Sequence, residues 1–164
     1  NALLTKTKET TAFLKDLNEQ ISKDDTANLY VIHGTPRLDT VGIDSISYSA
    51  SFLELISENN FTCSLEGAFP YFEINDVIKS RIEKLGLKKV QVVPLLLVSG
   101  NHYIEDMFEI KDDLSDKFES FIVPSLTKSE KFNLIELPMI QNIIEKNIQN
   151  TFKMMGISHK EITY

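Results

Sequence analysis

Two histidines, His33 and His102, follow apolar segments at points where an α/β protein often carries reactive residues. His33 follows the apolar run 29–32, and His102 comes shortly after the run 90–98. Both runs are typical of buried parallel strands. The carboxyl ends of such strands meet at one edge of a sheet, where neighbouring strands lie about 5 Å apart. The pattern therefore predicts a shared metal or catalytic site, with imidazoles that suit cobalt, nickel, iron or zinc.

A third ligand to such an ion is normally a carboxylate, and Glu73, Glu105 and Asp106 are the candidates. Glu105 and Asp106 follow His102 by three and four residues. On a helix they would share its side, so they could orient the imidazole ring rather than bind the metal. The alternative is that both histidines are ordinary polar loop residues, which predicts imidazoles that are far apart or turned away from each other.

The rest of the chain shows helical and strand patterns in alternation. Apolar spacing predicts helices at residues 7–22, 43–56, 74–85, 104–117 and 138–152, and strands at residues 29–32, 61–69, 90–98 and 121–123. This order predicts an α/β fold with a four-stranded parallel sheet flanked by helices on both faces, as in a flavodoxin-like three-layer sandwich. Pro94 would remove one ladder hydrogen bond, which favours a bulge or a strand-end adjustment there.

Composition excludes several classes of protein. The chain has 164 residues, enough for one domain, and a net charge of −7, which disfavours nucleic-acid binding. Its one cysteine, Cys63, permits neither an internal disulfide nor a cysteine-rich zinc site, and its apolar surroundings predict a small buried side chain. No apolar run is long enough to span a membrane and no signal peptide is visible, so we expect a cytoplasmic protein.

Several familiar motifs are missing from the sequence. No GxGxxG follows the first predicted strand, so a Rossmann dinucleotide site is not supported. The chain also lacks a Walker A lysine and a G-x-S-x-G elbow. These absences disfavour phosphate chemistry and serine hydrolysis.

Three segments together carry a family resemblance. Residues 94–107 read PLLLVSGNHYIEDM, and they combine with His33-Gly34-Thr35 and Gly67-Ala68-Phe69. This set resembles the C-terminal half of the anaerobic-pathway sirohydrochlorin cobaltochelatases, in the chelatase superfamily. The resemblance covers residue 28 to the end of the last predicted helix, and the long third-strand motif is its most specific part.

The resemblance implies a reaction and a set of site residues. Enzymes of this family insert Co²⁺ into sirohydrochlorin, release two protons and use no organic cofactor. Their two histidine ligands carry over to His33 and His102, which are thereby expected to hold the metal and to take up pyrrole protons. The expected glutamate position is occupied here by Pro70. Glu73 is therefore the predicted third ligand, and Glu66 is the alternative.

The resemblance also implies a larger assembly. Family members have two similar α/β halves with the tetrapyrrole between them, so residues 1–164 are expected to form one such half. Residues 25–155 would be its core, and the leading helix within residues 1–24 would connect it to the other half. The second half would lie in the same chain or in a homodimer mate. Tyr71 and Tyr103 are expected in the wall of the tetrapyrrole cleft.

A rival hypothesis keeps the fold and gives up the catalysis. In it, Pro70 marks a lost metal ligand, and the domain binds a tetrapyrrole or a metal ion without joining them. The two hypotheses differ in whether a carboxylate oxygen can reach the point between His33 and His102.

Overall fold

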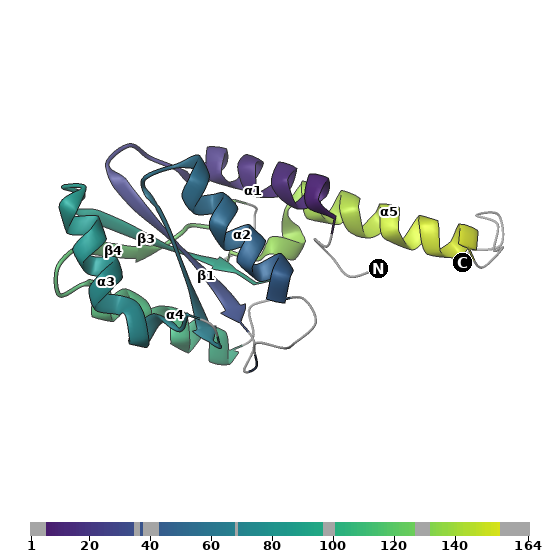
Figure 1. The fold of residues 1–164 in the computed structure, drawn as a ribbon. Helices are drawn as coiled ribbons and strands as arrows, with labels where there is room; N and C mark the ends of the chain where they lie inside the picture. The colour runs from purple at the N-terminus through teal and green to yellow at the C-terminus, as the bar shows by residue number, and fades with distance from the viewer. Residues whose placement is uncertain are drawn as a thin grey trace.

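The computed structural model describes residues 6–34, 37, 43–67, 69–96, 101–126 and 132–154, apart from the side chains of residues 101–103. Helices and strands alternate along the chain (Figure 1). In order they are α1 (Thr7–Ile21), β1 (Thr26–Gly34), α2 (Ile43–Ile56), β2 (Asn60–Glu66), α3 (Tyr71–Lys84), β3 (Lys89–Leu95), α4 (Asn101–Leu114), β4 (Glu119–Ile122), η1 (Leu134–Glu136) and α5 (Pro138–Met154). The four strands are parallel, in the order β2-β1-β3-β4. The predicted α/β fold class is confirmed, and β1 and β3 are neighbours.

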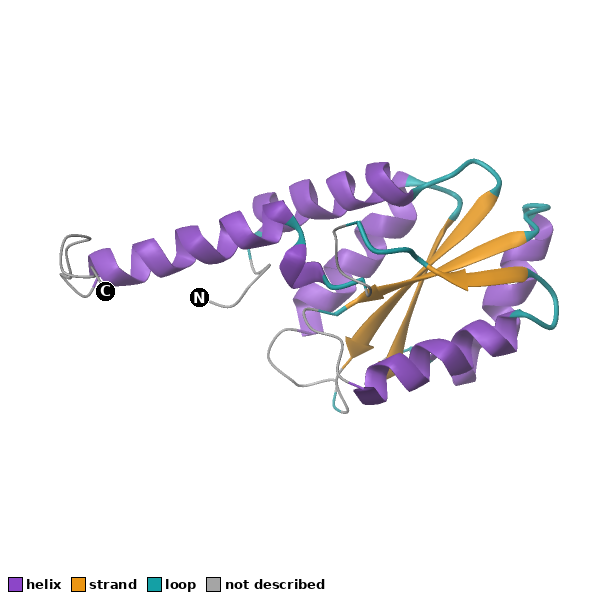
Figure 2. Cartoon of the chain, turned by 180° about the vertical axis from the view of Figure 1, so that it is seen from behind, coloured by secondary structure: helices purple, strands orange, loops and turns teal. Residues whose placement is uncertain are grey.

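Each face of the sheet carries its own hydrophobic core. The helices α3 and α4 cover one face, and α1, α2 and α5 lie on the other (Figures 1 and 2). In β1, Leu29 and Val31 pack toward α3 and α4, while Tyr30 packs toward α1 and α2. Side chains alternate between the faces of a strand, so His33 lies on the same face as Val31.

The leading helix α1 is part of the packed core. Its residues Phe13, Leu14 and Leu17 are each at most 2% exposed, and they pack with Tyr30 of β1. Their spacing is the 3.6-residue period by which the sequence predicted this helix. Whether α1 also connects to a second half stays a prediction. Among the described residues, no helix is long and apolar enough to cross a membrane.

Several predicted boundaries differ from the structure by up to three residues, and two of these differences bear on the candidate site. The second strand was expected to reach residue 69, but β2 ends at Glu66 because Gly67 takes a left-handed φ of +89°. His102 was expected in a loop, but it belongs to the first turn of α4. Asn, His and Tyr are only weakly unfavourable in a helix, so residues 101–103 can extend the helix whose buried face includes Met107.

Pro94 lies inside β3 without breaking the sheet. It pairs in register with Val31, and no bulge interrupts the described pairing of β1 with β3. The edge strand β4 pairs no further than Val92, whose carbonyl accepts a hydrogen bond from Val123. Alternate residues of a strand direct their backbone groups to the same side, so Pro94, like Val92, faces the β4 side of β3. At position 94, however, β4 has already ended. An N–H is not needed there, which is why proline is tolerated.

A row of amide side chains crosses the sheet at its opposite end. Asn28 pairs in register with Asn60 on one side and with Gln91 on the other. The side-chain Nδ2 of Asn28 donates to Oδ1 of Asn60 at 2.8 Å, and Oδ1 of Asn28 accepts from Nε2 of Gln91. All three side chains are at most 1% exposed, so a register slip would leave buried polar groups unpaired.

Gly34 ends β1 at a point where only glycine fits. Its φ is +82°, and a Cβ atom built on it would lie 1.9 Å from the backbone oxygen of Glu66. The two residues are partners in the pairing of β1 with β2. This contact between backbones holds His33 beside the end of β2.

Replacing Gly34 by alanine is expected to destabilise the protein by more than about 3 kcal/mol, because a left-handed backbone and a backbone clash add together. Gly86 provides a matched control, since its φ is +72° and a Cβ atom added there would meet nothing within 4 Å. Gly86→Ala should cost only about 1 kcal/mol. Denaturant unfolding measures both values, and equal losses would contradict the role given to the close approach.

Candidate functional site

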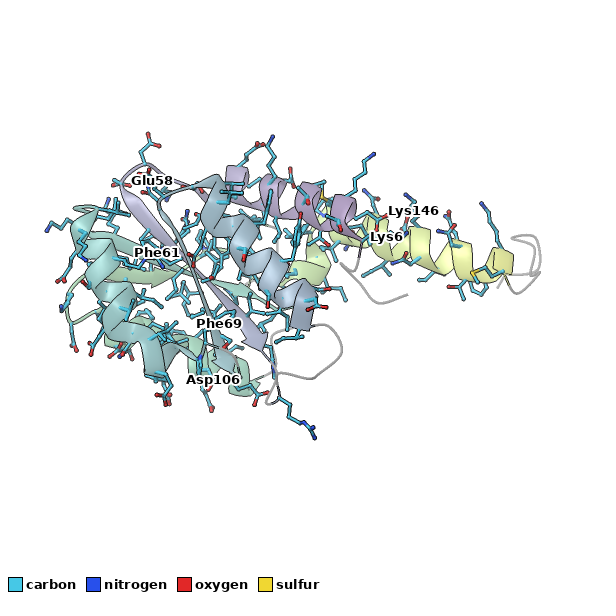
Figure 3. All side chains as sticks on the ribbon, in the orientation of Figure 1. Lys6, Glu58, Phe61, Phe69, Asp106 and Lys146 are labelled. Atoms are coloured by element: carbon cyan, nitrogen blue, oxygen red, sulfur yellow. The ribbon has the colours of Figure 1, made fainter. Side chains whose placement is uncertain are left out.

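A pocket of about 420 Å³ opens at the carboxyl ends of β1 and β2, between the first turn of α3 and the middle of α4. Its lining residues come from these four elements: His33, Leu65, Glu66, Tyr71, Phe72, Asp106, Glu109 and Ile110. Figure 3 shows the labelled Asp106 beside the carboxyl ends of the strands and Glu58 beside their opposite ends. The pocket lies at the sheet edge where ligands bind in parallel α/β folds.

The orientation of His33 determines which of its nitrogens can react. The side chain is 40% exposed, and its Nδ1 lies 3.1 Å from the carbonyl oxygen of Gly34. A carbonyl oxygen only accepts hydrogen bonds, so Nδ1 carries the proton and donates it to this bond. Nε2 then bears the lone pair, which makes it the atom for a metal ion or a proton.

Glu66 brings a carboxylate next to this ring. Its Oε1 lies 3.5 Å from Nδ1 of His33, and its side chain is 47% exposed. The register of β1 and β2 causes this proximity, because Glu66 is paired with Gly34. The imidazole and the carboxylate therefore both line the pocket at the same end of the sheet.

The α4 side of the pocket adds further negative charge. Asp106 and Glu109 lie three residues apart on α4, so they share one side of the helix. Together with Glu66 they make the pocket acidic, which favours cations over anions. Among the residues whose side chains the structure describes, no three His, Cys, Asp or Glu are grouped closely enough to hold a metal ion.

The predicted site residues are distributed unevenly around this pocket. Of the candidate carboxylates, Glu66 and Asp106 line it, while Glu73 and Glu105 are exposed and are not part of its wall. Glu109, which the sequence analysis missed, lines it too, and its spacing of three residues from Asp106 was the available signal. Pro70, at the position where a glutamate was expected, directly precedes the first residue of α3.

Two predicted site residues lie partly outside the description. The backbone of His102 belongs to α4, but its side chain and that of Tyr103 are not among those described. The shared His33–His102 metal site and the role of Tyr103 therefore stay predictions.

Cys63 takes the place that its apolar surroundings predicted. It is 0% exposed in the core between the sheet and α3 and α4. Burial raises the pKa of its thiol far above the usual range. This cysteine is therefore a packing residue, as predicted, and not a nucleophile.

Tyr71 lines the pocket with its ring and is tied down by its hydroxyl group. The residue is 1% exposed, and its hydroxyl donates to Oδ2 of Asp113 at 2.7 Å. Burial, together with the neighbouring Asp113 carboxylate, raises the pKa of the Tyr71 phenol. The same Oδ2 accepts from Asn75 at 3.2 Å and from Lys79 at 2.8 Å. The phenol therefore acts as a neutral anchor for the pocket wall.

These donors also determine how Asp113 titrates. Burial alone would raise its pKa, but the hydrogen bonds from Lys79, Tyr71 and Asn75 outweigh burial and hold the pKa below the ordinary value of 3.8. A carboxylate with a lowered folded-state pKa stabilises the fold fully above its unfolded-state pKa. That stabilisation is lost as the pH falls through the folded-state value.

We expect Asp113→Asn to lower the free energy of unfolding at pH 7 by about 2 kcal/mol, the size of hydrogen bonds to a charged group. The difference between wild type and variant should shrink below about pH 4, where Asp113 begins to gain a proton. Denaturant unfolding from pH 7 down to pH 2 measures this. If the difference in unfolding free energy stays constant from pH 7 to pH 2, the Asp113 carboxylate does not stabilise the fold through its charge.

Comparisons with known proteins bear on the family and the fold. The model of the CbiK family, described as cobalt chelatase, matches residues 3–153. A crystal structure described as a cobalamin (vitamin B12) biosynthesis CbiX protein from Marinobacter aquaeolei is similar, with a TM-score of 0.58 and 18% identity. That match covers 79% of this chain and 98% of the other. No curated protein matches the chain.

A second similar structure is a multi-domain protein from Deinococcus radiodurans, described as structurally similar to chelatases and as having two additional novel domains. Its TM-score is 0.54 at 13% identity, over 84% of this chain and 28% of the other. At these identities both structures establish the fold alone.

Proposed function

The chain belongs to the CbiK family of cobalt chelatases, and on that premise we propose that it inserts Co²⁺ into sirohydrochlorin during cobalamin biosynthesis, as one half of the enzyme. Co²⁺ is a substrate in this reaction. The macrocycle gains bonds from its nitrogens to the metal and releases two protons. The observation that carries the proposal is the acidic pocket in which Glu66 lies 3.5 Å from His33, at the carboxyl edge of the sheet.

Capture of the ion is the first task that these residues can perform. The carboxylates of Glu66, Asp106 and Glu109 raise the local concentration of divalent cations at the pocket. An imidazole nitrogen then favours transition metals over Mg²⁺ and Ca²⁺. In the proposal, Nε2 of His33 and the side chain of His102 hold the ion until the macrocycle takes it.

Proton removal is the second task. When the ion moves to the macrocycle, Nε2 of His33 loses its metal and can accept one of the two pyrrole protons, while the imidazole of His102 accepts the other. The resulting imidazolium keeps its Nδ1 hydrogen bond to Gly34, and the Glu66 carboxylate stabilises its charge. The same ring thus serves as a ligand before the transfer and as a base after it.

We assign the carboxylate of this site to Glu66 in preference to Glu73. Glu66 lines the pocket and lies beside His33, whereas Glu73 is exposed on the first turn of α3. The tetrapyrrole would lie on the apolar part of the wall. There Phe72 is 54% exposed, and its ring meets that of Tyr71 edge to face at 5.1 Å. We place Tyr103 on the same wall, and a second half or a homodimer mate on the other side of the macrocycle.

Calorimetry with Co²⁺ at pH 7 tests the proposed metal site. The wild type should bind one ion, and His33→Ala and His102→Ala should each weaken binding at least about 100-fold, as expected for loss of one ligand. Glu66→Gln should weaken binding about tenfold or more, and Glu73→Gln should have a smaller effect than Glu66→Gln.

Glu58→Gln is the matched control, because Glu58 is exposed at the opposite end of the sheet. Binding that resists both histidine substitutions would overturn the metal site, and a larger loss with Glu73→Gln would transfer the carboxylate role to that residue. Tight binding without formation of the cobalt tetrapyrrole, measured by absorbance with the second half present, would favour the non-catalytic binding module instead.

A further inference from the structure

We propose that Asp113 is a positioning residue, which fixes α4 against α3 and so places the first turn of α4, including His102, beside the pocket of His33. The link to Co²⁺ rests on the proposed function, whereas the placement of the helix does not. Three features of Asp113 support this role: several donors converge on one of its oxygens, its ion pair is mostly shielded from solvent, and it lies on the pocket side of α4.

Three donors from one stripe of α3 converge on a single oxygen of α4. Tyr71, Asn75 and Lys79 are spaced four residues apart, so they form one row along α3. All three donate to Oδ2 of Asp113, at 2.7, 3.2 and 2.8 Å respectively. A single acceptor with three donors along two turns of a helix restricts both sliding and rotation of α4.

The ion pair within this group is largely removed from solvent. The Lys79 side chain is 8% exposed and that of Asp113 is 25% exposed. Loss of one partner would leave a poorly solvated charge, which costs far more than loss of a surface pair. The pair between Glu83 and Lys117, at 3.1 Å, joins the last turn of α3 to the turn that follows α4, but both of its side chains are 48% exposed.

Asp113 lies on the stripe of α4 that lines the pocket. Asp106, Glu109 and Ile110 face the pocket, and Asp113 follows at the next position of the same row. His102 lies eleven residues before Asp113 in the same helix, about 16 Å along its axis. A helix transmits a tilt along its length, so loosening its Asp113 end displaces the turn that carries His102.

The test uses Lys79→Met, which removes the charged donor and keeps the aliphatic bulk of the side chain. Lys79 itself does not line the pocket. Lys117→Met is the matched control, since it removes the same charge from the exposed pair. Lys79→Arg keeps a charged donor and should retain the wild-type helix distance and Co²⁺ affinity. Tyr71→Phe provides a milder second variant should Lys79→Met fold poorly.

Two measurements are made below the melting temperature of every variant. In the metal-free protein, spin labels at Asp76→Cys on α3 and Glu105→Cys on α4 report the distance between the helices, while Cys63 is too buried to be labelled. Calorimetry then gives the affinity for Co²⁺ alone. For Lys79→Met we expect a broadened distance distribution and Co²⁺ binding at least fivefold weaker, and for Lys117→Met we expect wild-type values of both.

The outcomes separate this inference from the proposed function. An unchanged distance distribution in both Lys79→Met and Tyr71→Phe would overturn the positioning role. A broadened distribution with unchanged Co²⁺ affinity would overturn its link to the metal. If the wild type binds no Co²⁺ while Lys79→Met still broadens the distribution, the proposed function fails and the positioning of α4 stands.

Discussion

The structure depends on the register of the three strands β2, β1 and β3, and buried amide groups determine that register. Asn28 bonds to Asn60 and Gln91 across two strand pairs, in a place where water cannot substitute for a lost partner. Apolar side chains alone would tolerate a shift of two residues, because each would again face its own core. The amide row does not tolerate it. Because the register is constant along the strands, the pairing of Asn28 with Asn60 at one end also determines the pairing of Gly34 with Glu66 at the other end.

The site is therefore a consequence of pairing as much as of local sequence. The close approach of the two backbones at Gly34 puts the imidazole of His33 beside the carboxylate of Glu66, and the Gly34 carbonyl selects the tautomer of the ring. The opposite wall of the pocket comes from α4, which the partly buried carboxylate of Asp113 ties to α3. The buried amide row and the hydrogen bonds to Asp113 thus position the residues of the pocket. The apolar cores supply most of the stability.

The sequence predicted what periodicity and strand ends can reveal: the fold class, the parallel strands, the leading helix and the place of His33 near the carboxyl end of β1. It missed what depends on contacts between distant segments. Linear spacing predicted Glu73 as the third ligand, with Glu66 as the alternative, and it could not show that the register of β1 with β2 brings Glu66 beside His33. The roles of Gly34 and Asp113 were likewise hidden, because the first requires the position of a neighbouring backbone and the second requires the packing of two helices. Glu109 alone left a local signal.

In the proposed function, this edge of the sheet binds Co²⁺ through Nε2 of His33. Anomalous diffraction at the cobalt absorption edge, from crystals of the protein soaked with Co²⁺, locates the ion and identifies its ligands. We expect one strong peak within bonding distance of Nε2 of His33, with a nitrogen of His102 and the Glu66 carboxylate also in contact. A cobalt ion bound elsewhere on the chain, or bound through Nδ1 of His33 with the Gly34 hydrogen bond broken, would contradict it.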